Sequence, residues 1–146
     1  MRNVTLPNEE LLPEVVKMLS EGSRVSLKAK GASMLPFIVG GRDHVLLEKK
    51  ETYTVGEIVM AEIAPKQFVV HRILKIDDKY VTLMGDGNLS GTEVCPKENI
   101  CGYVAHIVHN GKQIDCNSAA EQRKAQFWKN MLPIRRYLLA IYRRII

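Results

Sequence analysis

Ser33 is the first residue whose type and setting could do chemistry. It follows an alternating segment, residues 24–30, and stands between Gly31 and Pro36. Alternation of this kind predicts a half-buried strand, and Pro36 ends strand pairing. A serine at a strand end presents its hydroxyl near backbone N–H groups that no longer pair within the sheet. A nucleophile needs this arrangement, because the N–H groups can stabilise a developing oxyanion.

Two later segments supply the partners that a nucleophilic serine requires. His71 lies inside an apolar segment, residues 68–74, and Asp86 lies in a glycine-flanked turn after the predicted strand 80–83. A serine, a histidine and an aspartate brought together can act as nucleophile, general base and the acid that orients the base.

Each of these residues also has an ordinary structural explanation. The run around Ser33 is typical of a turn, a histidine in an apolar strand is often a core residue with satisfied polar atoms, and Asp86 lies in a common turn sequence. A dyad of Ser33 and His71 without Asp86 therefore stays open. Arg72 alternates away from His71 and is expected to be solvated or ion-paired; Asp43 is one candidate partner.

Four ordered segments together resemble signal peptidase I, in particular the branch of the endoplasmic reticulum and some bacteria that uses His where most bacterial enzymes use Lys. The wider clan includes the LexA-type self-cleaving repressors. The resemblance covers about residues 24–109, and its segments are residues 31–36, 56–59, 70–73 and 85–88.

This resemblance implies a serine endopeptidase that cleaves a peptide or preprotein, with Ser33 as nucleophile, His71 as base and Asp86 as the orienting acid. Many signal peptidases carry a Ser or Thr two residues before the nucleophile, where this chain has Gly31. The oxyanion donors are then mainly backbone N–H groups, including that of Ser33, with Gly31, Ala32 and Met34 in support. The resemblance also implies a substrate that lies as an added strand, with small side chains just before the cut.

Two other functions remain open. One is a LexA-like regulatory module whose peptidase acts only on itself; the sequence shows no DNA-reading domain, and it has His in place of that branch's Lys. The other is a non-catalytic binding module that retains the fold.

The chain of 146 residues predicts one mainly β, barrel-like domain with a helix at each end. We expect a catalytic domain over residues 1–118 and a basic, amphipathic helical tail over 119–146. A short N-terminal helix is predicted over 8–21, with Asn8 as its cap. The predicted strands are residues 24–30, 44–48, 56–63, 68–76, 80–84, 100–108 and 112–114.

The net charge of +5 is concentrated in the tail. Residues 121–146 carry seven Lys or Arg and one Glu, whereas residues 1–120 are close to neutral. Aromatic and aliphatic residues share this tail, a mixture that suits a helix on an anionic membrane surface. The alternative is a helix that packs its apolar stripe on the β domain, and each interpretation can hold for one half of the tail. Nucleic-acid binding is not expected.

The remaining composition predicts neither cofactor nor metal. The three cysteines form no C-x-x-C pair and the four histidines show no zinc-ligand spacing, so reduced thiols and no metal site are expected. No apolar run has the length of a signal peptide or a transmembrane helix. We therefore expect a cytoplasmic or peripherally membrane-associated protein.

Overall fold

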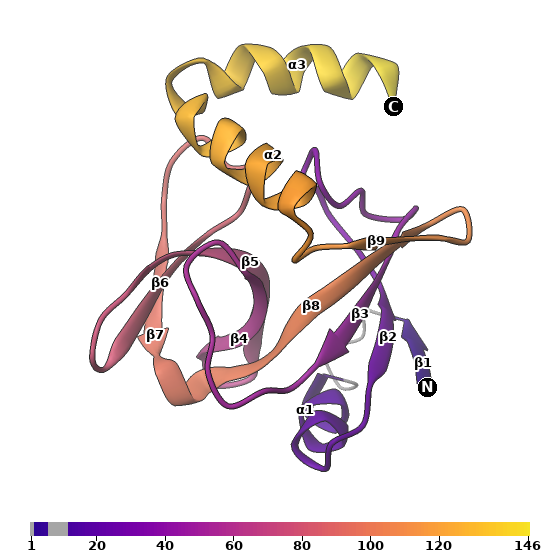
Figure 1. Cartoon of the computed structure of the whole chain (residues 1–146), viewed down its shortest axis with the longest axis vertical. Coiled ribbons are helices and arrows are strands. Elements are labelled where there is room, and N and C mark those ends of the chain that lie inside the picture. The colour runs from indigo at the N-terminus through magenta and orange to yellow at the C-terminus, as the bar shows by residue number, and fades with distance from the viewer. Residues whose placement is uncertain (1, 6–11) are drawn as a thin grey trace.

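A computed structural model describes residues 2–5 and 12–146. Its centre is a nine-stranded sheet in the order β1-β2-β3-β8-β4-β5-β6-β7, with β9 paired to β8 (Figure 1). The strands are β1 (Arg2–Thr5), β2 (Val25–Lys28), β3 (His44–Glu48), β4 (Ile58–Ala64), β5 (Gln67–Ile76), β6 (Tyr80–Met84), β7 (Glu93–Pro96), β8 (Ile100–His109) and β9 (Lys112–Asp115).

The sheet curls into an antiparallel half-barrel, and among its described strands only β1 and β2 pair in parallel. The long strand β5 shows how the sheet curls: its first half pairs with β4 and its second half with β6. The mainly β, barrel-like prediction with helices at both ends is therefore confirmed. The short strands β1 and β7 were not predicted.

Helix α1 (Leu12–Ser20) covers one side of the sheet because its apolar residues recur at helical spacing. Val15 and Leu19 are fully buried in the largest core cluster, together with residues of β2, β3, β4 and β8. Gly22 has a positive φ of 87°, and its N–H donates to the Leu19 carbonyl, so the chain leaves the helix there. The predicted cap Asn8 lies outside the described residues.

Both predicted hairpins form. Strands β5 and β6 pair across the turn at Asp77, and β8 and β9 pair across Asn110-Gly111. Asn110 and Gly111 have φ values of 50° and 77°, as the tight turn of a two-residue hairpin requires.

The C-terminal residues form helix α2 (Ala119–Asn130), the 3-10 turn η2 (Leu132–Ile134) and helix α3 (Arg135–Ile145). The Ser118 side chain caps α2 by accepting a hydrogen bond from the Glu121 N–H. The two helices lie together at the end of the sheet opposite α1 (Figure 1). Within the part of the chain that the structure describes, no helix is long and apolar enough to cross a membrane.

Candidate active site

The Ser33 segment is a tight turn that follows β2. Gly31 has a φ of 82°, and the Met34 carbonyl accepts hydrogen bonds from the Phe37 and Ile38 N–H groups. The chain then returns so closely that a Cβ on Gly40 would lie 2.2 Å from the Gly31 carbonyl oxygen. Only glycine fits at position 40, and the turn leaves Ser33 half-buried at the rim of a cavity.

His71 lies on β5, with 6% of its surface exposed. Its Nδ1 lies 2.5 Å from Oε1 of Glu93, the first residue of β7. When Nδ1–H donates to this carboxylate, the other ring nitrogen, Nε2, carries the free lone pair. The Glu93 contact thus favours the tautomer that a general base needs.

Ser33 and His71 line the same cavity of about 220 Å³, together with Ile38, Val45, Met60, Phe68 and Val70. A Cβ placed on Gly85 would lie 2.3 Å from the Ser33 carbonyl oxygen and 3.1 Å from His71 Nε2, so both atoms approach one point. Among the described residues, no hydrogen bond joins the Ser33 hydroxyl to His71. Such bonds often tighten only when substrate is bound.

Among the described residues, no hydrogen bond or ion pair joins the Asp86 carboxylate to His71, so the structure does not contain the predicted triad contact. Arg72 holds this carboxylate instead, with Nε 2.9 Å from Oδ1 and Nη2 2.6 Å from Oδ2. The reason is strand alternation: His71 and Arg72 are consecutive on β5 and point to opposite faces. Arg72 is ion-paired, as one of the two expectations had it, but its partner is Asp86. Asp43 binds Arg42 and His109.

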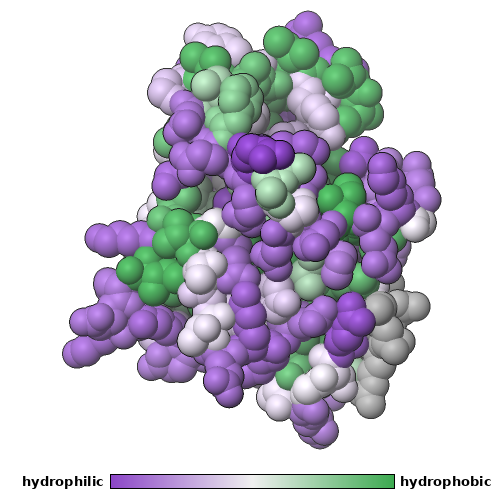
Figure 2. Space-filling view, in the orientation of Figure 1, coloured by the Kyte–Doolittle hydropathy of each residue, from purple (hydrophilic) through white to green (hydrophobic). Residues whose placement is uncertain are grey.

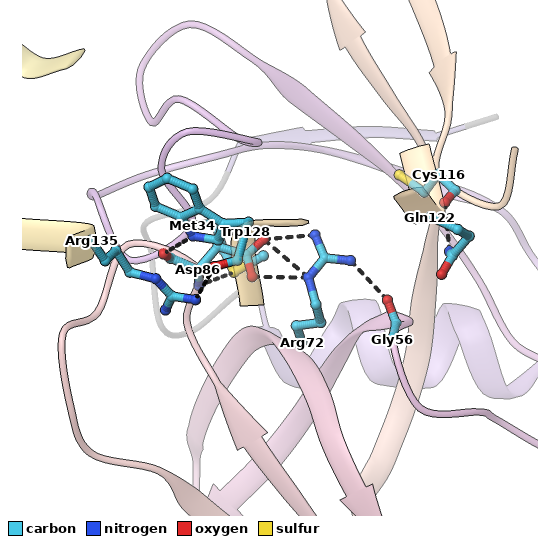
Figure 3. A network of polar contacts seen from close by, with 8 residues as sticks. All are labelled: Met34, Gly56, Arg72, Asp86, Cys116, Gln122, Trp128 and Arg135. Atoms are coloured by element: carbon cyan, nitrogen blue, oxygen red, sulfur yellow. Dashed lines mark hydrogen bonds and ion pairs between the residues drawn. The ribbon is translucent and has the colours of Figure 1, made fainter. Parts of the chain in front are cut away.

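The Asp86 pair belongs to a polar network that holds the turn at residues 85–88 (Figure 3). Arg72 Nη1 also donates to the Gly56 carbonyl at 2.8 Å, and its guanidinium lies over the Phe37 ring. The Asp86 N–H points at Met34 Sδ, 3.4 Å away, and the indole of Trp128 donates to the Asp86 carbonyl at 2.6 Å. Asp86 therefore positions the backbone beside the nucleophile.

The glycines of this turn permit direct backbone contact with the Ser33 segment. The Gly87 N–H donates to the Ser33 carbonyl at 2.8 Å, and a Cβ on Gly87 would lie 2.3 Å from the Ala32 carbonyl oxygen. Any side chain at position 85 or 87 would push the nucleophile segment away. The Gly-Asp-Gly pattern is thus explained by close packing of two turns.

The backbone around Ser33 is hydrogen-bonded mainly through its carbonyl groups. Among the described residues, the carbonyls of Ala32, Ser33 and Met34 accept hydrogen bonds, while the N–H groups of Ser33 and Met34 donate none. Backbone hydrogen bonds thus leave these two N–H groups as candidate oxyanion donors. Gly31 contributes the positive φ of the turn, and the Met34 side chain packs below Asp86.

The strand beside the cavity has a free edge. Residues 67–71 of β5 pair with β4 on one side, and pairing with β6 begins only at Arg72. Within the described residues, the other edge of 67–71 has no strand partner. A peptide in extended conformation could pair there and pass His71.

Glu93 is the residue that the sequence analysis missed. Glu93 lies seven residues after Asp86 and is the first residue of β7, which pairs with β6. The only local signal is an acidic residue at the start of a short strand next to the histidine-bearing hairpin. Its contact with His71 depends on how three strands curl together.

A family model described as Peptidase S24-like matches residues 5–108, which include Ser33, His71, Asp86 and Glu93. The chain therefore belongs to the Peptidase S24-like family, in the clan that joins LexA-type peptidases and signal peptidases. No curated protein matches the chain. The family indicates a serine-type peptidase and agrees with the half-barrel fold.

Proposed function

We propose that this chain is a serine endopeptidase that cleaves peptides or preproteins in the manner of the His-type signal peptidases. The observation that supports it best is the shared cavity of Ser33 and His71, with Glu93 bound to the far nitrogen of the imidazole. Nucleophile, base and orienting acid then come from three separate segments.

In this mechanism, His71 Nε2 takes the Ser33 proton as Oγ attacks the scissile carbonyl. Glu93 stabilises the imidazolium that forms, while the N–H groups of Ser33 and Met34 face the oxyanion. The tetrahedral intermediate collapses to an acyl-enzyme as the imidazolium protonates the leaving amine. Water, deprotonated by His71, then releases the acyl product.

The free edge of residues 67–71 supports an extended substrate. Main-chain hydrogen bonds along this edge would hold a peptide regardless of its sequence, and the cavity would select the side chain before the cut. The cavity walls are mostly apolar, including Ile38, Val45, Met60 and Val70. Small uncharged residues before the scissile bond fit this lining.

A fluorophosphonate probe tests the nucleophile directly. The full-length chain should be labelled, and Ser33→Ala should abolish both labelling and peptide cleavage, because the probe reacts only with an activated serine. Ser90→Ala is the matched control, since Ser90 is an exposed serine outside the cavity. Unchanged peptide cleavage by a folded Ser33→Ala protein would exclude the proposal.

The base is tested by the pH dependence of cleavage. The rate should rise with pH as an imidazole deprotonates, and His71→Ala should remove this rise together with several orders of magnitude of activity. Lys30 also lines the cavity. A rise only in the range of a lysine, with full activity in His71→Ala, would assign the base to Lys30.

The family match favours a second candidate, a regulatory module that cleaves only itself. Such a chain would cleave itself at a rate that does not depend on protein concentration, and Ser33→Ala would stop this self-cleavage. An intact chain that cleaves added peptide excludes this candidate. A folded chain that does neither supports a binding module that retains the fold.

A further inference from the structure

Helix α3 has one face that packs on the body. Leu139 is buried in a small cluster with Leu35 and Trp128, and Leu138 and Tyr142 pack at its edge. Leu35 lies two residues after Ser33, so α3 is attached to the nucleophile segment itself.

A second face of α3 is apolar and uncovered. Tyr137, Ile141 and Ile145 follow one another at intervals of four residues and therefore lie along one line of the helix. They are 65%, 61% and 75% exposed. Seven of the eleven exposed large apolar side chains among residues 12–146 lie in residues 127–146. Figure 2 shows apolar surface gathered over the end of the molecule that the C-terminal helices form.

Positive charge borders this line of apolar residues. Arg136, Arg143 and Arg144 are exposed on α3, and no acidic residue follows Glu121 in the chain. On a helical projection with 100° per residue, Arg144 lies about 20° from Tyr137, whereas Arg136 and Arg143 lie about 100° and 120° from it, on the side that leads round to Leu139. A protein surface that covered the line would have to match it with acidic groups, whereas anionic lipid headgroups supply negative charge along its whole length.

We propose that the outer face of α3, defined by Tyr137, Ile141, Ile145 and the flanking Arg136, Arg143 and Arg144, binds an anionic lipid surface. The helix lies flat, with its apolar line among the acyl chains and Arg144 at the lipid phosphates, while Arg136 and Arg143 add positive charge further round the helix. Because α3 packs on Leu35, this contact holds the Ser33 segment close to the membrane surface. The proposal concerns binding alone and does not depend on peptidase activity.

The test is co-sedimentation of the full-length chain with phosphatidylcholine vesicles that do or do not contain phosphatidylglycerol. The wild-type chain should sediment with the anionic vesicles and be partly released by salt. Replacing Tyr137, Ile141 and Ile145 by Ser should abolish binding. Replacing the three arginines by Gln should weaken binding roughly 100-fold at low salt. Each basic residue near an anionic surface contributes about 1 kcal/mol to binding, and about 1.4 kcal/mol corresponds to a tenfold change in affinity.

The matched control replaces by Ser a tyrosine and two aliphatic residues that lie elsewhere on the surface, Tyr80, Leu89 and Val94. Each of these three residues is about half exposed. This variant should bind like the wild type, and all variants should keep its melting temperature. Equal binding of the α3 serine variant, or no binding by the wild type, would overturn the proposal. A wild-type dimer that the α3 substitutions dissociate, without vesicle binding, would assign the face to a second copy instead.

Discussion

His71 and Arg72 are neighbours on β5, and each holds a different carboxylate. Glu93 binds the imidazole, while Asp86 binds the guanidinium and, through its carbonyl, the indole of Trp128. The two acids thus divide two tasks: orientation of the candidate base and support of the turn beside the nucleophile.

Substituting the two acids should separate these tasks. Glu93→Gln should leave the melting temperature nearly unchanged but lower kcat by roughly two to four orders of magnitude, because the imidazole loses the charge that stabilises its protonated form. Asp86→Asn should lower the free energy of unfolding by about 3 kcal/mol, because it leaves the Arg72 guanidinium buried without its counter-charge. Kinetics and urea unfolding of both variants provide the measurement, and the reverse pattern would return the orienting role to Asp86.

Asp43 gives a pH-dependent prediction at the same scale. Burial raises the pKa of its carboxyl, but hydrogen bonds from Arg42 and the Val39 N–H outweigh this, and the pKa is lowered overall. A lowered folded-state pKa stabilises the protein above about pH 4, the unfolded value, and this contribution disappears as the pH falls through the folded value.

Asp43→Asn should therefore lower the free energy of unfolding at neutral pH by about 1–3 kcal/mol, since the variant weakens a buried set of charged hydrogen bonds. The difference from the wild type should shrink as the pH is lowered below 4. Urea unfolding across this pH range measures it. If the difference in unfolding free energy between the variant and the wild type stays constant with pH, the negative charge of Asp43 is not what stabilises its contacts with Val39 and Arg42.

At the scale of elements, the sequence predicted local features and hairpin pairs well, but it did not predict pairing between strands that are distant in the chain. The alternating segment 24–30 became β2, the apolar segment 68–74 became part of β5, and Asn110-Gly111 became a hairpin turn, because these features depend on local conformation. Strand β1 was missed because it pairs in parallel with β2 across the intervening α1, which no local pattern reveals.

In the candidate site, too, local features were predicted and contacts between distant segments were not. The sequence identified Ser33, His71 and the turn around Asp86, because glycine, proline and an isolated histidine are visible locally. It could not assign the acids, because the partner of His71 depends on how β5, β6 and β7 curl. The close packing of Gly87 against Ala32 was likewise not predictable, since it joins turns more than fifty residues apart.

Trp128 of α2 and Arg135, the first residue of α3, together clamp the 85–88 turn. Trp128 donates to the Asp86 carbonyl, and Arg135 reaches the carbonyls of Asn88 and Trp128 at 3.0 and 3.1 Å. The tail predicted as a separate unit over 119–146 thus contributes contacts to the body through both of its helices.

Trp128→Phe should lower the free energy of unfolding by about 1–3 kcal/mol, because it leaves the buried Asp86 carbonyl without its donor. Peptidase activity should fall more than stability accounts for, since the turn also fixes Ser33. Phe127→Leu is the control, because Phe127 is exposed and makes no such bond. Equal effects of the two substitutions would show that the indole hydrogen bond does not support the turn.

At the scale of the whole molecule, the three cysteines report on packing in two core clusters. Burial raises the pKa of Cys101 to about 11 and that of Cys116 to about 12, and it also raises the pKa of Cys95. Cys95 lies in one cluster, and the other two lie in the cluster beneath α1. All three thiols therefore stay protonated and covered at neutral pH.

The native chain should react slowly with Ellman's reagent at neutral pH, and all three thiols should become reactive in one step when the protein unfolds in urea, because only the thiolate attacks the reagent. A cysteine that reacts early would show that its cluster opens separately from the rest. Serine variants at each position would identify which thiol it is.

Because Trp128 and Arg135 hold the turn beside Ser33, the site can be completed only after these two residues have been synthesised. Ser33 precedes the residues that hold the neighbouring turn by about a hundred positions, so it leaves the ribosome before they do. We therefore expect a nascent chain to have no peptidase activity until its C-terminal helices have emerged, which would protect the polypeptides around it during synthesis. Stalled chains that end before and after residues 128–135 can be compared by fluorophosphonate labelling, and labelling of the shorter chains would show that the nucleophile matures without its clamp.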